Sequence, residues 1–205
     1  METIILKTFL LISVIVVLLP DLCGYLILRR PTDIEPNKRT RKIKRYYALW
    51  AISYLSWIAI VVLYWIDPSS VEWFGKITLL DKTPIRVFSM VVVCFGYYLL
   101  MITSVFHMFK KIKLAAGGEI PLITSGIFSF VRHPMYLSVD IGALGTFLLL
   151  PNLFSLTMAV GMIASLYGVG LEEEKNLLKV YGEEYDKYKN EVGMFFPRLK
   201  RSSEK

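Results

Sequence analysis

Five apolar segments constrain the fold of this 205-residue chain more than any other feature of its sequence. Apolar runs of roughly 18 or more residues are typical of transmembrane helices. Because 55% of the residues are hydrophobic, a soluble domain of this length would lack the polar residues needed to cover its surface. We therefore predict an all-α polytopic membrane protein, a bundle of about five transmembrane helices. The segments cover about residues 4–28, 47–66, 86–109, 135–150 and 153–170.

Lysine and arginine are concentrated in two of the segments that connect these helices. Connections rich in Lys and Arg stay on the cytoplasmic side, so we predict an outside N-terminus and a cytoplasmic C-terminus. We further predict that the host membrane is the cell membrane of a prokaryote. We attribute the formal net charge of +7 to this topology and to anionic lipid headgroups rather than to nucleic-acid binding. The basic residues are Arg29, Arg30, Lys38, Arg39, Arg41, Lys42, Lys44 and Arg45 in the first connection, and Lys110, Lys111, Lys113 and Arg132 in the third.

Most polar residues of chemical interest follow residue 110. We predict three transmembrane helices in residues 1–110 and a catalytic half in residues 111–205, with a cofactor loop, a helical hairpin and a cytosolic amphipathic helix. The hairpin turns at Pro151 and Asn152. The chain has only two histidines and two cysteines, and both cysteines lie in apolar runs. These numbers predict neither a metal site nor a disulfide framework.

A polar turn, Arg132-His133-Pro134-Met135-Tyr136, precedes the fourth apolar segment. Pro134 suits the first turn of a helix, where its missing N–H is not needed. His133 and Tyr136 then lie on one helix face, together with Asp140 one turn later. Backbone N–H groups at such a helix start can bind an anionic group such as a carboxylate. A purely structural interpretation stays open, with Arg132 as a membrane anchor and Tyr136 as an interfacial aromatic residue.

Three consecutive glutamates, Glu172, Glu173 and Glu174, follow the fifth apolar segment. At about 100° per residue, Glu174 lies in the middle of an apolar and aromatic stripe, Glu173 at its flank, and Glu172 points away. A carboxylate on a packed face is costly unless a polar or cationic group meets it. Glu174 is therefore the carboxylate with the strongest predicted role, and Glu173 the second. The stripe consists of Leu171, Leu178, Tyr181, Tyr185 and Tyr188.

Two aspartates, Asp21 and Asp140, lie within apolar segments. Ionisable residues inside a membrane are functional-site candidates by default, because burying them in lipid is costly. For Asp140 a structural role is also open, in which its carboxyl group accepts a hydrogen bond from a tyrosine or from the backbone.

Two strings of residues resemble one known family. Residues 122–136, Leu-Ile-Thr-Ser-Gly-Ile-Phe-Ser-Phe-Val-Arg-His-Pro-Met-Tyr, look like the cofactor-binding signature of the isoprenylcysteine carboxyl methyltransferase and phospholipid methyltransferase superfamily. So do Glu173 and Glu174, followed by Tyr-Gly-Glu-Glu-Tyr at 181–185 and Phe-Phe-Pro at 195–197. The resemblance covers roughly residues 118–198.

The resemblance implies a membrane methyltransferase that uses S-adenosylmethionine and acts on a lipidic or prenylated acceptor. Its best single form is carboxyl O-methylation of an isoprenylcysteine, with no metal and no nucleic acid involved. It implies catalytic roles for Glu173 and Glu174, and we consider Arg132 and Asp140 as substrate-binding candidates. The implied cofactor-binding residues are Leu122, Ile123, Gly126, Phe128, His133, Pro134, Tyr136 and Glu174.

One departure from the family pattern concerns the acceptor. Carboxyl-methylating members typically carry an arginine about a turn ahead of the paired glutamates, suited to grip a carboxylate. Here residues 166–171 contain no basic residue. Amino-phospholipid N-methylation is therefore a second hypothesis for the acceptor chemistry. Two further hypotheses are a sterol-reductase-like membrane enzyme that uses NADPH and a non-catalytic membrane protein of the same fold.

Overall fold

The structure is a computed structural model that describes residues 2–27, 41–115 and 121–198, with side chains described for 3–18, 42–105 and 121–198. Within these ranges the chain is helical and contains no strand, which confirms the all-α prediction. The α-helices are α1 (Glu2–Ile27), α2 (Arg41–Ile66), α3 (Thr83–Ala115), α4 (Pro134–Leu149), α5 (Leu153–Tyr181) and α6 (Glu183–Glu191). Two short 3-10 helices are η1 (Pro68–Phe74) and η2 (Gly126–Ser129).

Among the residues whose side chains the structure describes, three helical segments are long and apolar enough to cross a membrane: Lys42–Ile66, Thr83–Val105 and Leu153–Tyr181. Shorter apolar helical segments cover Thr3–Leu18 and Pro134–Leu149. At 1.5 Å per residue a 16-residue helix such as α4 is about 24 Å long, less than a hydrocarbon core of about 30 Å. The membrane-helix prediction therefore holds, and the number of five spans stays a prediction.

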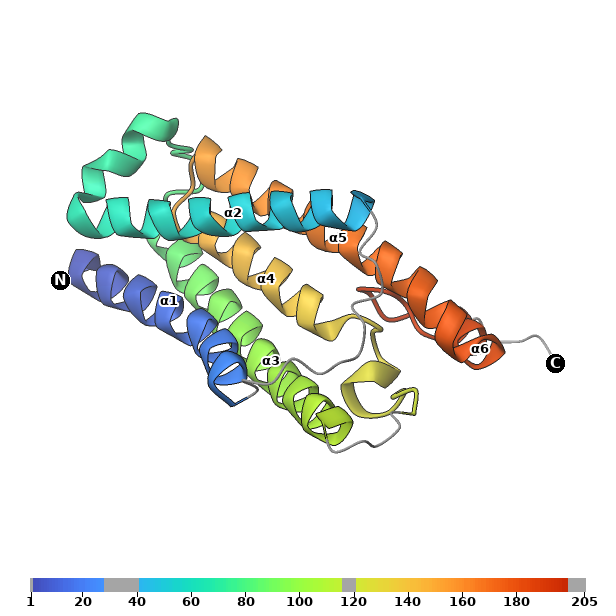
Figure 1. The fold of residues 1–205 in the computed structure, drawn as a ribbon. Coiled ribbons are helices and arrows are strands. Elements are labelled where there is room, and N and C mark those ends of the chain that lie inside the picture. The colour runs from blue at the N-terminus through green and yellow to red at the C-terminus, as the bar shows by residue number, and fades with distance from the viewer. Residues whose placement is uncertain (1, 28–40, 116–120, 199–205) are drawn as a thin grey trace.

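The helices run side by side, with α3 against α4 and α2 against α5, and the two termini lie at opposite ends of the bundle (Figure 1). Small residues bring α3 and α4 together. A Cβ atom on Gly96 would lie 2.9 Å from the Gly142 nitrogen and 3.0 Å from the Ser138 oxygen. Such close backbone approach is how helices associate within membranes.

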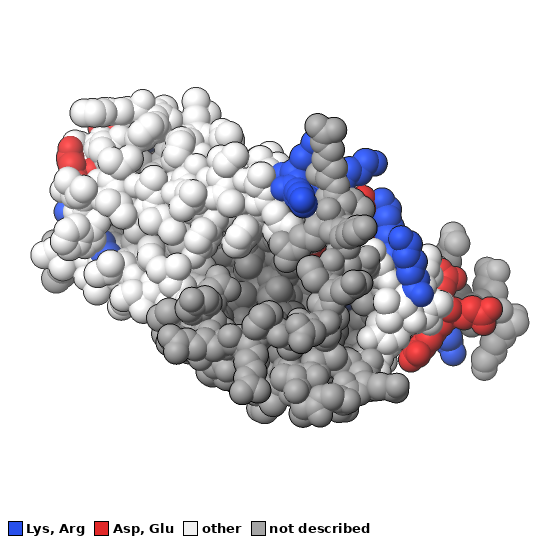
Figure 2. Space-filling view, viewed as in Figure 1, with Lys and Arg blue, Asp and Glu red and all other residues white. Residues whose placement is uncertain are grey.

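Among the described residues, charged side chains gather toward the ends of the bundle in the view of Figure 2, and the described surface between them is white. Lys42, Lys44 and Arg45 at the start of α2 lie at one such end. This distribution fits a protein whose middle lies in lipid. Several side chains named in the predictions lie outside those that the structure describes: Asp21, Arg29, Arg30, Lys38, Arg39, Arg41, Lys110, Lys111 and Lys113.

The predicted hairpin between the fourth and fifth segments is present at Pro151 and Asn152. The Asn152 side chain accepts a hydrogen bond from the Ser155 backbone N–H at 2.8 Å, and the Ser155 hydroxyl caps Asn152 in return. Asn152 and Ser155 are both fully buried. This reciprocal cap satisfies N–H groups that a helix start leaves without intrahelical partners. This cap fixes the residue at which α5 begins, and with it the position of the glutamates near the other end of α5.

The C-terminal stripe is not a single helix face, contrary to the prediction. Helix α5 continues to Tyr181, and Gly182 then adopts φ 55°, a left-handed conformation that favours glycine. Helix α6 starts in a new direction at Glu183. As a result Tyr185 and Tyr188 are buried, whereas Leu171 and Leu178 are exposed.

Candidate active site

A cavity of about 380 Å³ lies where α4 begins. Its walls come from the turn that precedes α4, from the last turns of α5 and from α6, with Thr103 contributed by α3. The two strings that the sequence singled out therefore face each other across one space. Six of the eight residues predicted to bind a cofactor line this cavity: Leu122, Ile123, Phe128, His133, Pro134 and Tyr136. The other two, Gly126 and Glu174, do not line it.

The turn before α4 is shaped by a few local features. Gly126 has φ 64°, which permits the sharp change of direction into η2. The Ser129 hydroxyl donates to the Gly126 carbonyl at 2.7 Å. Pro134 opens α4, and the rings of His133 and Tyr136 stack with centroids 5.4 Å apart and planes 7° apart. The predicted common face of His133 and Tyr136 is thus present and lines the cavity.

Glu173 brings a carboxylate to the cavity wall. The Tyr136 hydroxyl donates to Glu173 Oε1 at 2.7 Å, and His133 Nδ1 lies 3.9 Å from Oε2. The Glu173 side chain remains 36% exposed. Its carboxylate is therefore oriented by an aromatic hydroxyl while one side stays accessible to a bound molecule.

Glu174 lies behind that wall, with its side chain 2% exposed. Arg132 donates to Glu174 Oε1 from Nε at 2.9 Å and from Nη2 at 2.6 Å. Lys189 Nζ lies 3.1 Å from Oε2, and His133 Nε2 lies 3.4 Å from Oε1. The predicted need of this buried carboxylate for cationic partners is met by residues of this chain.

Glu172 does not line the cavity. Its carboxylate forms an ion pair with Lys175 Nζ at 2.6 Å, and the Lys175 side chain is 61% exposed. It matches the prediction of a residue outside the site, although the ion pair leaves the Glu172 side chain largely covered rather than exposed.

The sequence profile of the phospholipid methyltransferase family matches residues 83–184, about half of the chain. The match runs from the start of α3 to the start of α6, and so includes the turn before α4 and the paired glutamates. The chain belongs to this family of methyltransferases. The resemblance predicted from residues 122–136 and 173–188 is thereby confirmed.

Curated relatives carry related names. The protein-S-isoprenylcysteine O-methyltransferase of Saccharomyces cerevisiae is 36% identical over 93 residues, 44% of this chain and 39% of the relative. That of Xenopus laevis is 28% identical over 158 residues, 75% of this chain and 51% of the relative. The methanethiol S-methyltransferase of Pseudomonas deceptionensis is 34% identical over 79 residues, 37% of this chain and 28% of the relative.

The chain therefore spans between 28% and 51% of the length of these relatives. They come from a yeast, a frog and a bacterium, so the predicted prokaryotic membrane stays a prediction. The membrane location itself agrees with the apolar helices of the structure.

The two substrate-binding candidates lie in different surroundings. Arg132 is in the cavity wall, but Nε and Nη2 donate to Glu174, and Nη1 donates to the carbonyls of Lys189 and Val192. Its guanidinium is thus engaged within the protein, which leaves little of it for a substrate carboxylate. Asp140 is buried in α4 outside the cavity lining, and its Oδ1 has no hydrogen-bond partner among the described residues.

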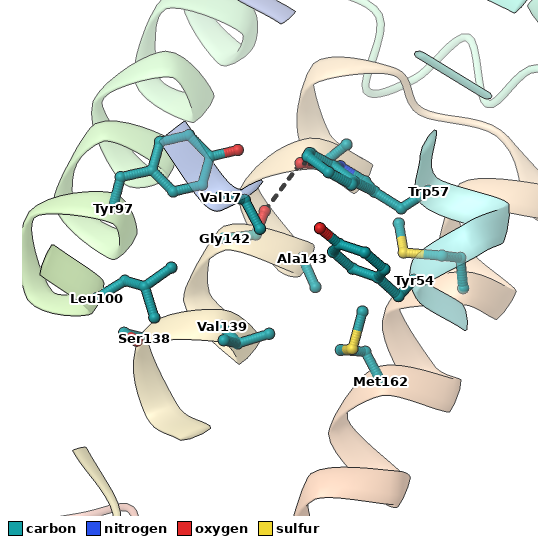
Figure 3. Close-up of a pocket in the computed structure, with 12 residues that line it drawn as sticks. Val17, Tyr54, Trp57, Tyr97, Leu100, Ser138, Val139, Gly142, Ala143 and Met162 are labelled. Atoms are coloured by element: carbon teal, nitrogen blue, oxygen red, sulfur yellow. Dashed lines mark hydrogen bonds between the residues drawn. The ribbon is translucent and has the colours of Figure 1, made fainter. Parts of the chain in front are cut away.

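A smaller apolar pocket of about 40 Å³ lies deeper in the bundle (Figure 3). Its lining includes Leu100 and Val139, each about one helical turn from a residue that lines the larger cavity, Thr103 and Met135 respectively. The small apolar pocket thus lies about one turn of α3 and one turn of α4 from the larger cavity. No cluster of three His, Cys, Asp or Glu side chains suited to a metal occurs among the residues that the structure describes.

Sequence reasoning missed the contribution of Lys189, Asn176 and Leu177. Asn176 and Leu177 line the cavity next to Glu173. Lys189 belongs to a charged helix whose other lysine, Lys187, is exposed. The sequence pattern of this helix therefore does not indicate that Lys189 pairs with a buried carboxylate. Only the change of direction at Gly182 brings its ammonium group to Glu174.

Proposed function

We propose that this protein is an S-adenosylmethionine-dependent methyltransferase whose acceptor is the carboxylate of an isoprenylcysteine or of a similar lipid-linked molecule. The observation that carries the proposal is the convergence of His133, Tyr136 and Glu173 on one cavity at the end of a membrane-type bundle. The names of the relatives support the reaction and the prenylated acceptor.

The residues of the cavity fit the proposed methyl donor. Its volume lies within the roughly 300–1,000 Å³ typical of small-molecule sites. Leu122, Ile123 and Phe128 supply apolar surface, and Glu173 supplies the negative charge that a sulfonium and an ammonium group require. The buried His133 ring lines the cavity with Nδ1 3.9 Å from Glu173 Oε2, whereas its Nε2 lies 3.4 Å from Glu174 Oε1. Bound S-adenosylmethionine supplies an electrophilic methyl group.

The protein contributes mainly by holding and orienting the methyl donor and the acceptor. An ionised carboxylate acceptor needs no proton removed, so positioning and exclusion of water supply most of the acceleration. Tyr136 fixes Glu173 through its hydrogen bond and fixes His133 through ring stacking. The buried rings of Tyr185 and Tyr188 form part of the cavity wall and exclude water there.

A second candidate acceptor is an amine or a thiol, as in amino-phospholipid N-methylation. The specific observation in its favour is the accessible carboxylate of Glu173, which is placed to take the proton that such an acceptor loses. The engagement of Arg132 by Glu174 points the same way, because it removes a carboxylate-binding cation. One relative is named for a thiol acceptor.

The experiment that separates these acceptors is methyl transfer from radiolabelled S-adenosylmethionine by the purified full chain. We expect label in a farnesylated cysteine, released by base because the product is a methyl ester. Base-stable label in an amino-phospholipid or a farnesyl thiol would select the second candidate. Absence of label in all three acceptors would overturn the proposed activity.

We also propose that the bundle forms five spans, with the C-terminal half of the site at the cytoplasmic face. In this arrangement a lipid-borne acceptor arrives from the bilayer and its apolar chain follows the contact between α3 and α4, where the small apolar pocket lies. Burial of that chain, at about 0.8 kcal/mol per methylene, then contributes to acceptor binding.

A larger side chain in the apolar pocket is expected to weaken binding of acceptors that carry a long apolar chain. Ala143 lines the pocket and is buried, so Ala143→Leu places three more carbons in its space. We expect the KM for a farnesylated acceptor to rise about five- to tenfold, which corresponds to a loss of about 1–1.4 kcal/mol, with kcat nearly unchanged. The KM for a short-chain analogue should stay the same. Leu144→Met, on the exposed side of α4, is the matched control. Equal KM changes for long and short acceptors would contradict this path.

A further inference from the structure

Helix α6 is joined to α5 through a single glycine turn. Gly182 has φ 55° and ψ −128°, and a Cβ atom there would meet no other atom within 4 Å. Beyond this turn, Tyr185 and Tyr188 line the cavity and adjoin the residues that precede α4. One wall of the cavity is therefore a short helix attached at an open, unpacked turn.

An ion pair joins the last turn of α6 to α5. Lys189 Nζ lies 3.1 Å from Glu174 Oε2, and the Lys189 carbonyl accepts a hydrogen bond from Arg132 Nη1 at 3.0 Å. Arg132 is almost completely buried, whereas the Lys189 side chain is 41% exposed. The buried Arg132–Glu174 pair is thus a fixed anchor, and the half-exposed ammonium group is the partner that solvent can reach.

A second set of contacts joins the same wall to the turn before α4. The Tyr188 hydroxyl donates to the Phe128 carbonyl at 2.7 Å. Burial raises the pKa of Tyr188 to about 12, so the hydroxyl keeps its proton at neutral pH. After α6, the Arg132 and His133 backbone N–H groups donate to the carbonyls of Gly193 and Met194 at 2.9 and 3.1 Å.

We propose that Lys189 and Tyr188 are positioning residues that help to hold α6 over the cavity, and that loss of either contact speeds the departure of the methyl donor. The proposal rests on the proposed function, because it takes S-adenosylmethionine as the occupant of the cavity. Neither residue takes part in the reaction itself. The Lys189–Glu174 contact sets how long the donor stays bound, and salt weakens that contact because one partner is half exposed.

The test is the dissociation rate of S-adenosylmethionine from the full chain in detergent, measured by displacement with excess S-adenosylhomocysteine. For Lys189→Met we expect release about tenfold faster, with methyl transfer per bound donor unchanged. Lys189→Arg should restore the wild-type rate, and Lys187→Met, an exposed neighbour on the same helix, should have no effect. Release from the wild type should accelerate with added salt, whereas release from Lys189→Met should respond much less.

Tyr188→Phe removes only the hydroxyl and provides a second variant if Lys189→Met does not fold. It should also speed release several-fold, while salt continues to accelerate release as in the wild type. Release from both variants at the wild-type rate, or release from the wild type that salt does not change, would overturn this inference and leave the proposed function standing. Failure of the wild type to bind S-adenosylmethionine would instead remove the proposed function itself.

Discussion

Glu174→Gln is expected to destabilise the C-terminal half of the protein by about 3–5 kcal/mol and to abolish binding of the methyl donor. The substitution keeps the size of the side chain but removes the negative charge that lies between Arg132 and Lys189. Because the Arg132 side chain is only 6% exposed, its charge would be left buried without a counter-ion. Thermal unfolding in detergent and equilibrium binding of S-adenosylmethionine measure the two effects.

Glu172→Gln is the matched control, because it changes the same residue type two positions earlier on the same helix. The ion pair of Glu172 is with Lys175, a mostly exposed side chain, and such pairs contribute about 0–1 kcal/mol. Unfolding and donor binding should both stay near wild type. Similar losses from the substitutions at 172 and 174 would refute the assignment of Glu174 as the buried anchor of the site.

Glu173→Gln is expected to leave stability unchanged and to lower kcat/KM for methyl transfer by about 100-fold, within the range that charge and proton-transfer roles supply. The side chain is partly exposed, so its amide keeps a favourable environment and can still accept the Tyr136 hydrogen bond. What is lost is the negative charge at the cavity wall. Steady-state kinetics with a melting curve on the same preparation check this expectation.

Whether the loss of kcat/KM in Glu173→Gln comes from KM or from kcat also distinguishes the acceptors. If the acceptor is a carboxylate, Glu173→Gln should act mainly through weaker donor binding, so the KM for S-adenosylmethionine rises. If the acceptor is an amine or a thiol, kcat should fall and its dependence on pH should change, because the proton acceptor is gone. Glu184→Gln, an exposed residue at the start of α6, is the control. Full activity of Glu173→Gln with both acceptor types would contradict a role for this carboxylate.

The parts of the fold set by local sequence were predictable. Apolar runs placed α4 and α5 within a residue or two of their N-terminal ends, and Pro151 and Asn152 marked the turn between them. The C-terminal stripe failed because periodicity assumes one continuous helix, whereas Gly182 changes the direction of the chain. A glycine after a helical run is a known stop signal, and this one divides the stripe into two faces.

Sequence patterns indicated several residues that line the cavity, among them His133, Tyr136 and Glu173, but not how they are arranged. Helical spacing indicated that Glu174 is buried and needs a cation, which the structure provides through Arg132. Spacing alone does not tell whether a buried carboxylate faces a cavity or an ion pair. That depends on Lys189, which reaches Glu174 only because α6 folds back along the turn before α4. Glu173, at the flank of the predicted face, is therefore the carboxylate on the cavity wall.

The most direct test of the central claim, that the cavity between the turn before α4 and α6 binds a methyl donor, is calorimetric titration of the full chain with S-adenosylmethionine. We expect saturable binding at one site, no binding of NADPH, and at least tenfold weaker binding for His133→Ala, which removes the ring stacked on Tyr136. Lys187→Met should bind as the wild type does. Lack of S-adenosylmethionine binding by the wild type, or binding of NADPH in its place, would contradict the account.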